Sequence, residues 1–177
     1  MNTETNHVQL TLDGLAVTRP PAKPARPLVS LRFRISESIE PAGKATFSTS
    51  TAVFDYAHEL ALADREFFII LHLNTKNRLI ESEIHAIGAV DSSAVYPREV
   101  MRSALLYNSS WLIFVHNHPS GDPEPSVCDM DITRALVNAA QLLGLKVLDH
   151  IIIGRDRYYS FSDHGKIEDY ERTSNFK

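Results

Sequence analysis

The sequence predicts an α/β fold in which helices flank a mixed β-sheet. Three short apolar runs have the composition of buried strands: EFFIILHLN (66–74), WLIFV (111–115) and LKVLDHIIIG (145–154). Between them lie stretches whose apolar residues recur with helical spacing. Strands that alternate with helices in this way are expected to form a sheet with helices packed on it.

The first half of this fold is expected to contain one helix and one hairpin. STAVFDYAHELALAD (50–64) has the apolar spacing of an amphipathic helix, with Ser50 or Thr51 as its N-cap. EFFIILHLN and RLIESEIHAIGAV (78–90) flank the turn NTKN and are expected to pair as a hairpin.

The second half continues the pattern, giving the order α-β-β-α-β-α-β-β. Pro97 fits the first turn of a helix that ends near Tyr107, and WLIFV follows it as a strand. A long helix is expected from Ser126 to a stop at Gly144. The strand LKVLDHIIIG and a short strand, RYYSF (157–161), complete the sheet.

We expect one compact domain over residues 47–169. A flexible, Pro-rich N-terminal segment (1–46) precedes it, because TRPPAKPARPL (18–28) lacks many backbone donors and favours extended chain. LVSLRFRIS (28–36) alternates well enough for a strand. Residues 170–177 are expected to form a loose, polar C-terminal tail.

The composition limits which classes of protein this chain can belong to. The 177 residues are 44% hydrophobic, which suits one globular domain with tails. The formal net charge of -4 gives no general basic surface for nucleic acid. A single cysteine, Cys128, excludes an internal disulfide and favours a reducing compartment. With no signal-peptide pattern and no long apolar run, we expect a cytoplasmic protein without a membrane segment.

Two histidines follow WLIFV at alternate positions, His116 and His118. Side chains at i and i+2 of an extended strand point the same way, so both imidazoles are expected to face one point. Asp129 falls in the first turn of the following helix, whose N-terminus favours an ionised carboxylate. Two histidines and one carboxylate would hold a tetrahedral Zn²⁺ with a fourth position open, as in catalytic sites.

Each part of this pattern also has a purely structural explanation. A His-x-His pair at a strand end is more often a surface or hydrogen-bonded pair. Ser126 and Asp129 fit a capping box without any metal. Cys128, between them, is interpreted as a packing residue and not as a nucleophile. The combined pattern H-x-H-x7-S-x-x-D is much more specific than any of its parts.

HNHPSGDPEPSVCD (116–129) resembles the JAMM motif of the JAB/MPN metallopeptidases and, more closely, their RadC-like branch. LNTKNRLI (73–80), YPREVMRSAL (96–105) and LGLKVLDHIIIG (143–154) resemble the same branch, and together these stretches cover about residues 52–165. The resemblance implies a cytidine-deaminase-like α/β sandwich. No helix-hairpin-helix pattern precedes the domain, so the chain resembles the short, single-domain form.

The resemblance also implies roles for individual residues. Zinc would be held by His116, His118 and Asp129, and Ser126 would help to stabilise the reacting oxyanion. An upstream glutamate would act as acid and base. Glu66 matches best, although Glu81, Glu83 and Glu99 also lie upstream. His150 belongs to a matching stretch, but a histidine in an apolar strand is more often a satisfied core residue.

The leading functional hypothesis is a zinc-dependent peptidase or isopeptidase whose substrate is a protein or peptide, including a ubiquitin-like one. The alternative is a RadC-type accessory protein of DNA repair, which would contact nucleic acid through the basic residues between Arg19 and Arg34. An inactive JAB scaffold is a third reading, disfavoured by the complete ligand set. The sequence does not specify an oligomeric state.

Overall fold

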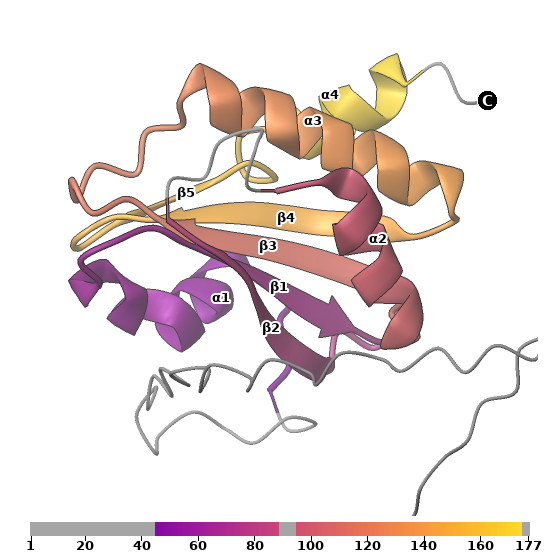
Figure 1. Cartoon of the computed structure of the whole chain (residues 1–177), viewed down its shortest axis with the longest axis horizontal. Coiled ribbons are helices and arrows are strands. Elements are labelled where there is room, and N and C mark those ends of the chain that lie inside the picture. Colours follow the sequence, from indigo (N-terminus) through magenta and orange to yellow (C-terminus); the bar gives the residue numbers. More distant parts are fainter. Residues whose placement is uncertain (1–44, 89–94, 175–177) are drawn as a thin grey trace, which may run out of the picture. The chain divides into compact units, whose positions relative to one another are not determined.

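The computed structural model describes residues 45–88 and 95–174, which form a five-stranded mixed sheet with helices on both faces (Figure 1). The strands are β1 (Phe67–Leu73), β2 (Leu79–Ile87), β3 (Trp111–Asn117), β4 (Lys146–Ile153) and β5 (Tyr158–Ser160). The helices are α1 (Ser50–Ala57), the 3-10 helix η1 (His58–Leu62), α2 (Pro97–Leu106), α3 (Val127–Leu142) and α4 (Lys166–Thr173). The α/β prediction is therefore confirmed.

The strand order in the sheet is β2-β1-β3-β4-β5. β1 and β2 form the predicted antiparallel hairpin, and β1 also pairs antiparallel with β3. β3 and β4 are parallel and are connected by α3, since parallel neighbours require a crossover. β5 returns antiparallel along β4.

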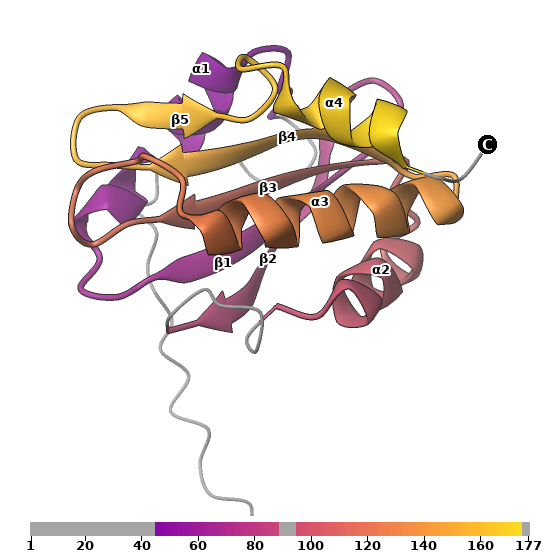
Figure 2. The ribbon, with the colours of Figure 1, turned by 90° about the horizontal axis from the view of Figure 1, so that it is seen from above.

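The sheet separates two hydrophobic cores because alternate side chains of a strand point to opposite faces. On one face, Phe68, Ile70 and Phe114 pack with residues of α2, α3 and α4. On the other face, Ile69 and Val115 pack with residues of α1. All seven residues of β1 are buried, and its sequence is apolar at every position except His72. Seen from above, α2, α3 and α4 cover the same face (Figure 2).

The first helix differs in detail from its prediction. Its N-cap is Thr49, whose hydroxyl accepts the backbone N–H of Ala52, and not Ser50 or Thr51. Ser50 instead donates its hydroxyl proton to Asp163. The α-helix ends at Ala57 and continues to Leu62 as a 3-10 helix.

The predicted loose tail from residue 170 is wrong for its described part. Helix α4 runs from Lys166 to Thr173, and its buried residues are Ile167 and Tyr170. The Tyr170 hydroxyl donates to the sulfur of Met130 in α3, and the Arg134 guanidinium lies over the Tyr170 ring. The segment is mostly polar because only one face of the helix is buried. Two apolar residues at helical spacing suffice to dock so short a helix.

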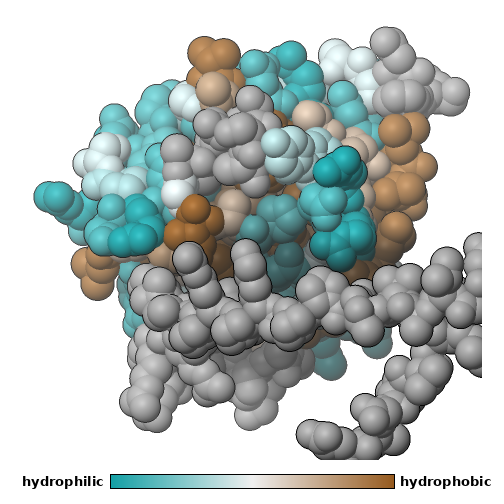
Figure 3. All heavy atoms as spheres, viewed as in Figure 1, coloured by the Kyte–Doolittle hydropathy of each residue, from teal (hydrophilic) through white to brown (hydrophobic). Residues whose placement is uncertain are grey.

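Most of the predicted N-terminal segment, including its strand at 28–36 and its basic residues, lies outside the described residues. Within residues 45–88 and 95–174, no helix combines the length and apolar character that a bilayer crossing requires. Figure 3 shows hydrophobic surface beside the ends of α2 and α3, where the exposed large residues include Leu105, Leu106, Leu142 and Leu143.

Candidate metal centre

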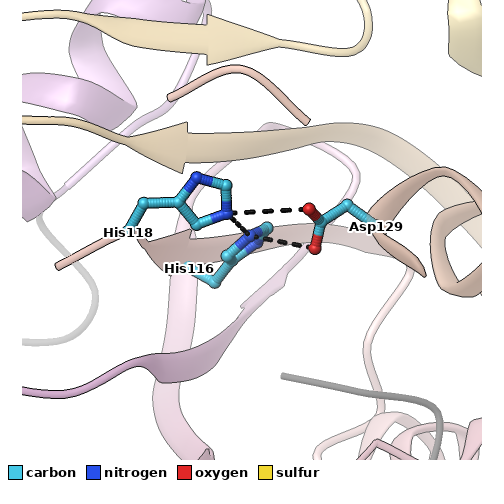
Figure 4. A group of neighbouring side chains, drawn as sticks. All are labelled: His116, His118 and Asp129. Atoms are coloured by element: carbon cyan, nitrogen blue, oxygen red, sulfur yellow. Dashed lines mark hydrogen bonds and ion pairs between the residues drawn. The ribbon is translucent and has the colours of Figure 1, made fainter. Parts of the chain in front are cut away.

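His116, His118 and Asp129 converge at one end of the sheet (Figure 4). β3 extends beyond WLIFV to Asn117, so His116 is its penultimate residue and His118 follows its end. Asp129 is the third residue of α3. The two Nε2 atoms lie 3.1 Å apart. Asp129 Oδ1 is 3.2 Å from His116 Nε2, and Oδ2 is 3.6 Å from His118 Nε2.

This arrangement suits a divalent cation. One ligand atom from each residue lies within 4.8 Å of the others, and among the described residues this is the one such group of three. His116 is fully buried and Asp129 nearly so, whereas His118 is partly exposed. Two imidazoles and one carboxylate are a ligand set that leaves a tetrahedral cation one open position. The residues present therefore fit a catalytic metal.

Ser126 fixes the carboxylate of Asp129. Its hydroxyl accepts the Asp129 backbone N–H, and Asp129 Oδ2 accepts the Ser126 backbone N–H at 2.7 Å, which completes the predicted capping box. The Ser126 hydroxyl also lies 2.6 Å from Oδ2 and donates to it. Both donors use Oδ2, so Oδ1 is the oxygen left for a cation.

The surroundings favour an ionised Asp129 and a neutral His116, which are the states that metal ligands need. Burial opposes ionisation of Asp129, but its contacts with His116, His118 and Ser126 hold its pKa well below its usual range. Burial lowers the pKa of His116, which favours its neutral imidazole. The hydrogen bond to Asp129 raises the pKa of His118, which favours its protonated form. A bound cation would take the place of that proton.

Each histidine is oriented through its second nitrogen. His118 Nδ1 lies 2.8 Å from the backbone oxygen of Asp122, to which it donates. His116 Nδ1 lies 2.8 Å from Nε2 of His150 in β4. His150 is thus a satisfied core histidine that also supports the candidate ligand. Its pKa is held well below its usual range by complete burial.

Asn117, between the two histidines, was not singled out from the sequence. Its fully buried side chain reaches the chain just before β1. Asn117 Oδ1 accepts the Phe67 backbone N–H at 2.8 Å, and Nδ2 donates to the Arg65 backbone oxygen at 3.0 Å. These two bonds bracket Glu66. A buried amide that replaces backbone pairing at a strand end has no local sequence signal, because its partners are far away in the chain.

Glu66 stands at the same end of the sheet as the two histidines. It directly precedes β1, where Phe68 pairs with His116. Its negative charge contributes to raising the pKa of His118, although the hydrogen bond to Asp129 is the larger cause. The Glu66 backbone oxygen accepts the N–H of Gly88 at 3.0 Å, which ties it to the end of β2.

The other upstream glutamates have different surroundings. Glu83 lies 3.1 Å from His85 Nδ1 and also contacts the Ser103 hydroxyl of α2. Glu99 forms surface ion pairs with Arg98 and Arg102. Cys128 is exposed, so its interpretation as a packing residue is wrong. It is the second residue of α3, and at that position its side chain faces solvent.

This fold and this site define a JAB-type α/β domain, and the chain belongs to the RadC-like JAB domain family, whose match covers residues 47–166. It is 52% identical over 101 residues to a UPF0758 protein of Methanosarcina acetivorans, covering 57% of this chain and 44% of that protein. It is 45% identical over 124 residues to a UPF0758 protein of Pseudoalteromonas translucida, covering 70% and 55%.

The chain therefore spans about half the length of these relatives. The UPF0758 protein YfjY of Escherichia coli K12 is closer in length, being 39% identical over 151 residues that cover 82% of this chain and 94% of YfjY. The family match over residues 47–166 contains the candidate ligands and the sheet that carries them.

Proposed function

We propose that this protein is a Zn²⁺-dependent hydrolase of peptide or isopeptide bonds. The observation that carries the proposal is the convergence of His116, His118 and Asp129 at the end of β3 and the start of α3. This ligand set keeps one position open, and the RadC-like JAB family supports a hydrolytic reaction. A cation held there would polarise a water molecule and a substrate carbonyl.

The chain's own residues would move the protons. Glu66 would accept a proton from the attacking water and return it to the leaving nitrogen. The Asn117 side chain, which bonds to the backbone of Arg65 and Phe67, would fix the backbone position of this glutamate relative to the histidines.

Ser126 has two roles in this proposal. Its hydroxyl accepts the Asp129 N–H through a lone pair, which caps α3 whatever the direction of its proton. Its O–H donates to Asp129 Oδ2. Rotation of this proton toward a substrate would let Ser126 stabilise an oxyanion, while its backbone N–H continues to hold Oδ2.

The proposed substrate is a protein or peptide, with a ubiquitin-like protein as one candidate. The alternative role in DNA repair depends on basic residues outside the described part of the chain, and nothing in residues 45–88 or 95–174 favours it. We therefore retain the hydrolase as the proposed function.

Zinc content and a pair of glutamate variants test this proposal. The purified chain should hold about one equivalent of Zn²⁺ by elemental analysis and should cleave fluorogenic peptide amides or isopeptide-linked conjugates. Glu66→Gln should keep the metal, while turnover falls by roughly 10²- to 10⁴-fold. Glu99→Gln, an exposed upstream glutamate, is the matched control and should keep full turnover. A wild-type chain without metal would contradict the proposal, and full turnover of Glu66→Gln would remove the assigned base.

A further inference from the structure

A continuous hydrogen-bonded path joins two of the candidate ligands behind the site. It runs from His116 Nδ1 to His150 Nε2 (2.8 Å), and from His150 Nδ1 to Thr133 Oγ1 (2.6 Å). It ends with Thr133 Oγ1 and the backbone oxygen of Asp129, 2.5 Å apart. His116, His150 and Thr133 are all completely buried. The path therefore has no access to solvent, and its protons must be shared among these groups.

The direction of each bond follows from the last one. A carbonyl oxygen has no proton, so Thr133 must donate its single hydroxyl proton to the Asp129 oxygen. Toward His150, Thr133 then offers only a lone pair. His150 Nδ1 must therefore carry a proton and donate it.

The surroundings of His150 keep its ring fixed and uncharged. Phe161 stacks on it, with ring centroids 5.0 Å apart and planes at 14°. Phe68 and Phe114 meet it edge to face. An imidazole enclosed by aromatic rings is disfavoured in its charged form. With its one proton on Nδ1, His150 has a lone pair on Nε2 and accepts a hydrogen bond from His116 Nδ1.

His116 could instead carry its single proton on Nε2. A proton on Nε2 would point to Asp129 Oδ1, 3.2 Å away, and would block the nitrogen that faces the candidate metal position. We propose that His150 and Thr133 are positioning residues that hold His116 with its proton on Nδ1, so that its Nε2 lone pair is free to bind a divalent cation. This inference rests on the proposed function, because it concerns the same metal site.

The parallel pairing of β3 with β4 fixes the position of His150 relative to His116. His150 pairs with Phe114, two residues before His116, so the two histidines lie diagonally on one face of the sheet. Thr133 lies one helical turn after Asp129 in α3. The hydrogen-bonded path through His150 and Thr133, called the relay below, thereby connects His116 of β3 to Asp129 of α3. We expect its loss to weaken metal binding by about 10- to 100-fold, as for other groups that orient metal ligands.

A matched pair of variants at Thr133 tests the relay. Thr133→Val keeps the shape of the side chain but removes the hydroxyl, whereas Thr133→Ser keeps the hydroxyl. Zn²⁺ affinity of the metal-free full chain would be measured by competition with a chromophoric chelator. We expect Thr133→Val to bind about 10- to 100-fold more weakly and Thr133→Ser to bind nearly as wild type. His150→Leu should weaken binding at least as much as Thr133→Val.

A second readout reports the tautomer itself. In the metal-free protein, ¹H–¹⁵N correlation spectra of the imidazoles should place the His116 proton on Nδ1 in wild type and Thr133→Ser. In Thr133→Val, part of the population should carry it on Nε2. Unfolding curves would verify that each variant is folded, and the Thr133 pair remains informative if His150→Leu does not fold.

The outcomes separate this inference from the proposed reaction. Equal Zn²⁺ affinity and an unchanged His116 tautomer in both Thr133 variants would overturn the relay, even if the wild type hydrolyses peptides. The expected difference in affinity, found in a chain that cleaves no peptide, would support the relay and contradict the hydrolase. A wild-type chain that binds no divalent cation would overturn both.

Discussion

Replacement of Asn117 by alanine should damage both the stability of the domain and the placement of its proposed base. The buried amide makes two hydrogen bonds, one with the Phe67 N–H and one with the Arg65 oxygen. Phe67 is itself 1% exposed, so no water would readily replace the lost partner of its N–H.

The magnitude follows from these two bonds. A typical intramolecular hydrogen bond contributes about 1 kcal/mol, and a buried donor left without a partner costs about 1–3 kcal/mol. We therefore expect Asn117→Ala to lower the free energy of unfolding by about 2–4 kcal/mol. Zinc content should be unchanged, because Asn117 is not a ligand. Turnover should fall by roughly 10²-fold, since a base displaced by about 1 Å loses much of its effect.

Urea unfolding, zinc analysis and peptide cleavage would measure the three effects. Asn138→Ala in α3 is the control, because Asn138 Oδ1 has no hydrogen-bond partner among the described residues and alanine favours a helix. Its stability should match or exceed that of the wild type. An Asn117→Ala variant that loses less than about 0.5 kcal/mol, a change typical of surface substitutions, would refute the reasoning.

Three further predictions concern the site and the opposite face of β4. Ser126→Ala should cost about 1 kcal/mol of stability as a lost cap but roughly 10²-fold in turnover as a lost oxyanion donor; unchanged turnover would reduce Ser126 to a cap. His118→Ala should abolish zinc retention with near-native circular dichroism, because the two hydrophobic cores and not the ion stabilise the sheet; unfolding on chelation would indicate a structural metal instead. Burial raises the pKa of Asp149 from 3.8 to about 6, against hydrogen bonds from Ser160 and Ser162. The folded state thus binds the Asp149 proton more tightly than the unfolded state does. This difference contributes about 3 kcal/mol to the free energy of unfolding. The contribution is complete below pH 3.8 and is lost as the pH rises through about 6. Unfolding free energies from pH 4 to 8 should show this loss in the wild type and not in Asp149→Asn; parallel curves would contradict the raised pKa.

The sequence by itself determined the strands, their hairpin and the three candidate ligands. Continuous apolar runs such as β1 are predictable because burial on both faces requires them. His116 and His118 were predictable because a strand imposes a two-residue period on its side chains, and Asp129 because Ser126 marks the helix start. These features depend on residues close together in the chain.

The tertiary structure decided what supports the site. Asn117 meets residues about 50 positions earlier, and His150 reaches His116 from 34 positions later. Helix α4 was missed for the same reason, since only docking against α3 distinguishes its two apolar residues from those of a polar tail. Hydrogen bonds and burial between distant segments leave no periodic pattern in either segment. They exist only once the parallel pairing of β3 with β4 and the packing of α3 have fixed which side chains share a face.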